Sequence, residues 1–159
     1  MSRIQLALNV SDLDAAVAFY SKLFGVEAAK RKPGYANFAI DEPPLKLVLI
    51  EAEEGGTLNH LGVEVDSAEE VVAAEGRLSA DGLATTGVDD TTCCYALKTE
   101  TWVNDPDGAP WEWYVKTGDA EQQGSTVRSG GGTGACCSTA AISQSVSLGA
   151  APGAASGCC

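Results

Sequence analysis

The chain has 159 residues, 45% of them hydrophobic and 20% charged, a composition typical of one globular domain with or without a tail. Its formal net charge of −12 argues against nucleic acid and anionic membranes as partners, because clusters of Lys and Arg bind both. No stretch approaches the roughly 18 apolar residues of a transmembrane helix, and the N-terminus lacks the apolar core of a signal peptide. We therefore expect a cytoplasmic protein, in which six cysteines indicate metal or metalloid binding rather than disulfides.

The first half of the chain predicts a strand, a helix and three more strands. The strand covers Gln5–Val10, and the Ser11-Asp12 pair after it is a helix cap. The helix has one apolar face, with residues at spacings of four, three and four: Leu13, Val17, Tyr20 and Phe24. Turns rich in Pro, Gly and Asp then separate three short strands, at 26–31, 35–40 and 45–50.

The second half repeats this order at an offset of 55 residues, with His60 in the position of Gln5. A strand at His60–Val65 precedes a cap at Asp66-Ser67 and a second, less strongly amphipathic helix. Three strands follow, at 83–88, 96–103 and 111–116. Two β-α-β-β-β modules, at about 1–55 and 56–117, predict an α+β fold. We expect one cupped eight-stranded sheet, helices outside, and a cleft on the concave face.

The composition changes after Lys116. Residues 118–159 are rich in Gly, Ser, Ala and Thr and contain no aromatic residue, so they cannot bury enough apolar surface to offset the loss of chain entropy. We expect a flexible tail, which carries two more cysteine pairs: Cys136-Cys137 and Cys158-Cys159.

The stretches "NVSDLDAAVAFYSKLFG" and "NDPDGAPWEWYV", with the duplication, resemble the vicinal oxygen chelate superfamily, also called glyoxalase/bleomycin-resistance/dioxygenase. The resemblance covers residues 3–117; an unrelated α+β domain is the alternative. It implies a divalent metal held by Gln5, His60 and Glu112. Gln5 and His60 are also equivalent under the repeat, and His60 is the only histidine. Gln5 stands where a histidine is more common, so Fe(II), Ni, Co, Mn and Zn all remain candidates.

Cys93 and Cys94 lie side by side in "TTCCYA", in a loop between the sixth and seventh predicted strands. Two adjacent thiols offer two soft donors to trivalent arsenic or antimony, Cd(II) or Hg(II). The alternative is a pair of small buried hydrophobic residues. The repetition of the same dipeptide in the tail favours metalloid binding. Three aromatic residues are candidates for the cleft wall, with core packing as their alternative role: Tyr95, Trp102 and Trp113.

The thiol pair together with the three metal-ligand positions is similar to the ArsI-type C–As lyases and the related cadmium-induced proteins. That resemblance implies Fe(II)-dependent, O₂-consuming cleavage of the carbon–arsenic bond in methylarsonous acid or trivalent aromatic arsenicals, with release of arsenite. Cys93 and Cys94 would then hold the substrate beside the catalytic metal. The alternatives are a non-catalytic cadmium- or metalloid-binding resistance protein and a glyoxalase-type metalloenzyme. Both a monomer and a homodimer fit the sequence.

Overall fold

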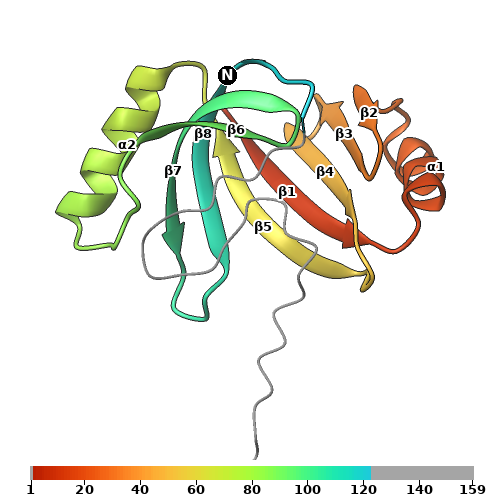
Figure 1. The fold of residues 1–159 in the computed structure, drawn as a ribbon, viewed down its shortest axis with the longest axis horizontal. Coiled ribbons are helices and arrows are strands. Elements are labelled where there is room, and N and C mark those ends of the chain that lie inside the picture. The colour runs from red at the N-terminus through yellow and green to blue at the C-terminus, as the bar shows by residue number, and fades with distance from the viewer. Residues whose placement is uncertain (1, 123–159) are drawn as a thin grey trace, which may run out of the picture.

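The computed structural model describes residues 2–122 as one eight-stranded sheet with two helices (Figure 1). In chain order the elements are β1 (Arg3–Val10), α1 (Leu13–Phe24), β2 (Lys30–Lys32), β3 (Tyr35–Ile40), β4 (Leu45–Glu51), β5 (Thr57–Glu64), α2 (Ala68–Ala80), β6 (Asp89–Cys93), β7 (Ala96–Asn104) and β8 (Pro110–Asp119). The order across the sheet is β2-β3-β4-β1-β5-β8-β7-β6. Within the described residues, neither helix is long and apolar enough to cross a membrane.

The two modules meet at the antiparallel pair β1 and β5 in the centre of the sheet. Gln5 lies opposite Gly62 and Ala7 lies opposite His60, so the pairing is symmetric under the repeat. Each central strand has a parallel neighbour from its own module, β4 beside β1 and β8 beside β5. The predicted fold of two β-α-β-β-β modules is therefore confirmed.

The helices begin at the predicted caps. The Asp12 side chain accepts a hydrogen bond from the backbone N–H of Ala15 at 2.9 Å, and Ser67 accepts one from Glu70 at 3.3 Å. Such bonds satisfy backbone donors that a helix N-terminus otherwise leaves open. α1 ends at Gly25, whose φ of 68° is readily adopted only by glycine.

Both helices pack on the convex face of the sheet, so that the concave face is left for the site. α1 packs on the alternating residues of β3 and β4 that include Phe38, Leu47 and Leu49, while α2 packs through Val71 on Val65 and Val115. Figure 1 shows the two helices at opposite flanks of the curved sheet. The opposite face carries a separate apolar cluster that contains both cysteines: Ala7, Tyr35, Val48, Ile50, Cys93, Cys94 and Tyr95.

Several predicted boundaries are wrong, and the strand predicted at His60–Val65 begins instead at Thr57. No strand forms at 83–88 apart from one isolated bridge between Thr85 and Val103, and Gly87, at φ 75°, interrupts the extended run. The sixth strand is instead Asp89–Cys93, which pairs with β7. The second strand shrinks to Lys30–Lys32, and β8 continues to Asp119, two residues into the predicted tail. The tail cysteines lie outside the described residues.

Candidate metal and thiol site

The three predicted metal ligands lie together on the concave face. Gln5 Nε2 is 2.9 Å from His60 Nε2 and 3.0 Å from Glu112 Oε2, and the last two atoms are 3.6 Å apart. Each of the three residues is at most 2% exposed. They come from β1, β5 and β8, which are neighbours in the sheet although the residues are up to 107 positions apart in sequence.

Gly62 makes room for this convergence. It lies between Gln5 and Glu112 across the three central strands. A Cβ at this position would lie 3.1 Å from the Glu112 carbonyl oxygen and 3.4 Å from Gln5 Nε2. A larger residue would therefore push against one ligand side chain and the backbone of another.

His60 is held as a neutral imidazole with its Nε2 lone pair facing Gln5 and Glu112. Its Nδ1 is 2.7 Å from Asn59 Oδ1, and the Asn59 amide donates in turn to Asn9 Oδ1 at 2.8 Å. This chain of bonds assigns the ring proton to Nδ1. Burial and the nearby Lys98 ammonium lower the pKa of His60 to about 3. The ring thus needs to lose no proton before it binds a cation at Nε2.

Glu112 is an ionised carboxylate inside the protein. Its Oε1 accepts a hydrogen bond of 2.6 Å from Lys98 Nζ, which leaves Oε2 directed at Gln5 and His60. Burial opposes ionisation, but Lys98 holds the pKa of Glu112 below its usual value. For the neighbouring Glu100, burial and the interaction with Glu112 raise the pKa, so Glu100 is protonated more readily than Glu112. Trp102 Nε1 donates to Glu100 at 3.0 Å.

The amide of Gln5 is fixed on its other side by Tyr114. The Tyr114 hydroxyl donates to Gln5 Oε1 at 2.6 Å and accepts from Lys46 Nζ at 2.8 Å. In this rotamer the amide nitrogen faces His60 and Glu112. A half-turn of the amide, which exchanges atoms of nearly equal size, brings the oxygen to that position.

The donor set fits one divalent cation. Two ligands that each lie about 2.1 Å from an ion are about 3.0 Å apart in octahedral geometry and about 3.4 Å apart in tetrahedral geometry. With the Gln5 amide turned so that its oxygen takes the place of Nε2, the separations of 2.9, 3.0 and 3.6 Å between Gln5, His60 and Glu112 are close to these values. Among residues 2–122 no three His, Cys, Asp or Glu side chains form such a cluster by themselves, and the predicted set has the amide of Gln5 as its third member.

The two cysteines stand at the tip of the β6–β7 hairpin. Cys93 is the last residue of β6, not a loop residue as predicted, and pairs with Ala96. Cys94 and Tyr95 form a two-residue turn with φ of 56° and 58°. The Cys93 and Cys94 sulfur atoms are 3.1 Å apart, close enough for one atom to contact both. Cys94 lines a pocket of about 200 Å³ that Gln5 and His60 also line.

The predicted wall aromatics divide between the two faces. The Trp102 ring lies 5.4 Å from the His60 ring, and Tyr95 closes the cleft by donating its hydroxyl to the Pro33 carbonyl of the first module at 3.2 Å. Trp113 packs beneath α2 instead, with Arg77 over its ring, so core packing is its role.

Four buried residues with polar groups around the ligands were not among the predicted site residues: Lys46, Lys98, Glu100 and Tyr114. A signal for two of them was present. Lys98 and Glu100 alternate with Trp102 in a strand that was predicted at 96–103, and the register places Trp102 opposite Glu112. Charged residues on one face of a strand that has neighbours on both sides predict a polar interior.

A family model described as "Glyoxalase/Bleomycin resistance protein/Dioxygenase superfamily" matches residues 3–113. A "trivalent organoarsenical cleaving enzyme" of Thermomonospora curvata is 53% identical over 161 residues, covering 100% of both chains. The "cadmium-induced protein CadI" of Mycobacterium bovis is 56% identical over 142 residues, covering 86% of this chain and 93% of that one.

A Mn(II)-bound glyoxalase from Novosphingobium aromaticivorans shares the fold, with a TM-score of 0.54 and 22% identity over 76% of this chain and 42% of that chain. The cupped sheet, its two-module order and these matches agree. The chain belongs to the glyoxalase/bleomycin resistance protein/dioxygenase superfamily.

Proposed function

We propose that this protein is a C–As lyase that cleaves trivalent organoarsenicals in an Fe(II)-dependent, O₂-consuming reaction and so detoxifies arsenic. One observation carries the proposal: Cys94, whose sulfur lies 3.1 Å from that of Cys93, lines the same pocket as the imidazole of His60 and the amide of Gln5, which lies 3.0 Å from the Glu112 carboxylate. The name of the relative that is 53% identical over the whole chain supports the same substrate class.

The thiols hold the substrate. Condensation of an arsonous acid, R–As(OH)₂, with the thiols of Cys93 and Cys94 forms two As–S bonds and releases two waters, while arsenic stays trivalent. Arsenic is a soft acceptor for which thiolate is a better ligand than a hydroxyl group. Two such bonds fix the remaining As–C bond beside Gln5 and His60, which supplies proximity and orientation. The reaction needs reduced thiols, and hence a reducing compartment such as the cytoplasm.

Gln5, His60 and Glu112 would hold the metal, and we assign Fe(II) to them because the reaction consumes O₂. Fe(II) would supply the redox chemistry with O₂ that side chains lack; Ni, Co, Mn and Zn would compete for the same donors. Asn59 and Lys98 orient His60 and Glu112 through the bonds at 2.7 and 2.6 Å, as outer partners of metal ligands do. All residues of the site come from one chain, so a monomer suffices.

The atoms balance with O₂ as the only oxidant for the methyl substrate. CH₃As(OH)₂ and O₂ give formaldehyde and As(OH)₃, so the carbon is oxidised and arsenic leaves as arsenite. An aryl substrate that gives phenol and As(OH)₃ needs two further electrons and two protons, which we assign to a thiol reductant in solution.

The test is anaerobic loading with Fe(II), then addition of methylarsonous acid and O₂. We expect one arsenite and one formaldehyde for each O₂ consumed. His60→Ala and Glu112→Ala should abolish arsenite release and weaken Fe(II) binding, yet leave binding of the arsenical to the thiols. Full activity of either variant would remove the metal assignment.

A second test addresses Cys93 and Cys94 in a full-length background whose four tail cysteines are serine. Cys93→Ser and Cys94→Ser should each cost nearly as much activity as the double variant, because one thiolate cannot form the chelate. Fe(II) binding should stay almost unchanged. Near wild-type cleavage by both single variants would show that the pair is structural.

The alternative function is cadmium or metalloid sequestration without catalysis, which the 56% identity to a cadmium-induced protein favours. It predicts Cd(II) binding that depends on Cys93 and Cys94 and no O₂-dependent release of arsenite.

A further inference from the structure

The pocket that contains Gln5, His60 and Cys94 is lined by half of the ten lysines and arginines of the chain. These five are Arg3, Lys30, Lys46, Lys98 and Lys116. The chain as a whole has a net charge of −12, so the pocket has the opposite sign to the rest of the molecule. The five cations are not spread over the surface but line a single pocket of about 200 Å³.

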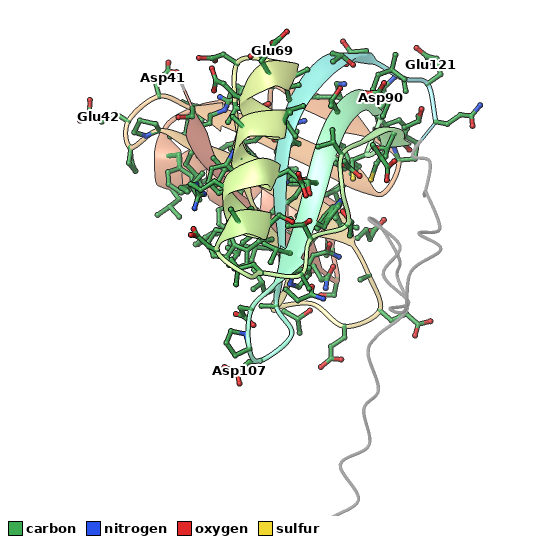
Figure 2. The ribbon with its side chains drawn as sticks, turned by 90° about the vertical axis from the view of Figure 1, so that its left-hand side faces the viewer. Asp41, Glu42, Glu69, Asp90, Asp107 and Glu121 are labelled. Atoms are coloured by element: carbon green, nitrogen blue, oxygen red, sulfur yellow. The ribbon has the colours of Figure 1, made fainter. Side chains whose placement is uncertain are left out.

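The acidic residues lie mostly elsewhere. Figure 2 shows Asp41, Glu42, Asp107 and Glu121 at the periphery, whereas Asp90 lies on β6, where it accepts a hydrogen bond from Thr99. All five are exposed. Charges beyond about 8–10 Å in water are largely screened at physiological ionic strength. The cations of the pocket therefore dominate the potential that a bound ligand meets.

Ion pairs do not neutralise these cations completely. Three carboxylates contact the five cations, and two of the three are each shared by two cations, which leaves an excess of two positive charges. The pairs are Glu64 with Arg3 and Lys46, Asp119 with Lys30 and Lys116, and Glu112 with Lys98. The Asp119 side chain is 65% exposed, so water weakens its effect on its two partners.

Lys30 has a donor to spare for a ligand. Its ammonium donates to the Tyr95 carbonyl at 3.0 Å and to the Asp119 carboxylate. An ammonium has three N–H donors, and two suffice for these partners among the described residues. Because Tyr95 follows Cys94 directly, this donor stands next to the predicted anchor of arsenic.

The rest of the pocket wall suits an aromatic ring. It contains small or apolar side chains from both modules: Ala29, Tyr35, Ala39, Val48 and Ala96. An apolar cavity of about 150 Å³ is known to accommodate benzene. A pocket of about 200 Å³ therefore has room for a ring with one small substituent.

We propose that the cations of this pocket recognise an anionic group on the substrate, so that the preferred substrates are trivalent aryl arsenicals with an acidic ring substituent. This inference rests on the proposed function for the arsenic end of the substrate. Arsenic binds at Cys93 and Cys94, the ring lies against the small apolar residues, and the anion meets Lys30 and its neighbours. A neutral methyl arsenical gains nothing from these cations.

The experiment compares 4-carboxyphenylarsonous acid with its neutral methyl ester on the full-length protein with serine at the four tail cysteines. Calorimetry without metal and O₂ should give at least about tenfold tighter binding of the acid, the range expected for a charge-assisted hydrogen bond. Lys30→Gln should move this ratio toward one. Lys22→Gln, on the exposed side of α1, should leave it unchanged.

Equal binding of acid and ester by the wild type would overturn the proposal, as would a ratio that survives both Lys30→Gln and Lys116→Gln. Lys116→Gln is the second variant in case Lys30→Gln fails to fold. The Lys116 side chain is 35% exposed, so the fold should tolerate its replacement. Free benzoate is the third ligand. If benzoate binds the pocket without weakening binding of the ester, the anion belongs to a separate molecule and the proposal fails.

Release of arsenite after addition of Fe(II), O₂ and a thiol reductant is measured separately. Discrimination in binding without cleavage would retain this inference and refute the lyase. Cleavage without discrimination would do the reverse.

Discussion

Lys98 is the least expected residue of the site, because it is a positively charged side chain, only 4% exposed, beside the ligands of a proposed cation. A buried lysine is stable only with a charged partner, and Glu112 provides one at 2.6 Å. The bond leaves one carboxylate oxygen, Oε2, for the metal. Burial is the larger cause of the low pKa of His60, and the Lys98 charge lowers this pKa further. One cation thus favours the charge states of two proposed ligands.

Removing Lys98 should therefore leave a buried carboxylate without its partner. We expect Lys98→Met to lower the free energy of unfolding by about 3–5 kcal/mol. Lys116→Met, at the position paired with Lys98 in the sheet but 35% exposed at its side chain, should cost less than about 1 kcal/mol. Urea unfolding measures both. A double Lys98→Met, Glu112→Gln variant should recover much of the loss; no recovery would mean that the two residues do not interact as a pair.

His60 gives the metal-free protein a predictable pH dependence. Below pH 6.5 the unfolded chain binds a proton at this residue, whereas the folded chain, with a His60 pKa of about 3, does not. Stability is therefore lost progressively as the pH falls from about 6.5 toward 3. Between pH 7 and pH 5 this residue should account for about 2 kcal/mol. Over the same interval the His60→Gln variant should lose about 2 kcal/mol less stability than the wild type, measured by urea unfolding. The same pH dependence in both proteins would contradict a buried neutral imidazole.

At the scale of elements, the β6–β7 hairpin determines where the thiols lie. A two-residue turn with positive φ at both positions is the type I′ turn, which is usually Asn-Gly. Here Cys94 and Tyr95 occupy it, at a cost of about 1–2 kcal/mol for each residue in the left-handed region. Bonds across the cleft hold the turn: the Tyr95 hydroxyl binds the Pro33 carbonyl, and Lys30 binds the Tyr95 carbonyl. The turn thus bridges the two modules (Figure 1).

The same substitution at the two adjacent cysteines should have different effects. Cys94→Val places a β-branched side chain at φ 56° and should destabilise the protein by at least about 2 kcal/mol. Cys93→Val is at the end of a strand, where β-branched residues are favourable, and should cost less than about 1 kcal/mol. Cys94→Asn, which tolerates the left-handed region, should lie between them. Equal unfolding midpoints for the two valine variants would show that the turn is not strained.

The elements that the sequence predicted well are those with a local signal. The cap at Asp12 and the apolar face of α1 are local, and the strand Tyr35–Ile40 has its predicted ends. The prediction failed at 83–88, where β propensity pointed to a strand but the partner of β7 is Asp89–Cys93. The convergence of Gln5, His60 and Glu112 followed from the repeat and the resemblance. The ion pair of Lys98 is a tertiary contact that no local pattern contains.

At the scale of the whole molecule, duplication builds the cup and the differences between the modules build the site. The first module contributes Gln5 and Lys30, whereas the second contributes His60, Glu112 and both thiols. The last strand completes this arrangement. Asp119 at its end binds Lys30 of the first module, and the Ala120 N–H donates to the Tyr95 carbonyl at 3.1 Å. These contacts favour a domain boundary after Ala120 over the predicted one between residues 117 and 118.

Two truncations test where the domain ends. A chain that stops after Gln122 retains all of β8, the ion pair between Asp119 and Lys30, and the bond from the Ala120 N–H to the Tyr95 carbonyl. Its melting temperature should therefore stay within about 2 °C of the full-length value. A chain that stops after Lys116 loses the pairing of Ala96 with Asp119 and of Leu97 with Gly118, and also the ion pairs of Asp119. These losses amount to at least about 2 kcal/mol and should lower the melting temperature by roughly 5–10 °C. Calorimetric scans of the three chains distinguish the outcomes. Equal melting temperatures for both truncations would place the boundary at Lys116, whereas loss of the folded state after truncation at Gln122 would show that the domain extends beyond the residues described here.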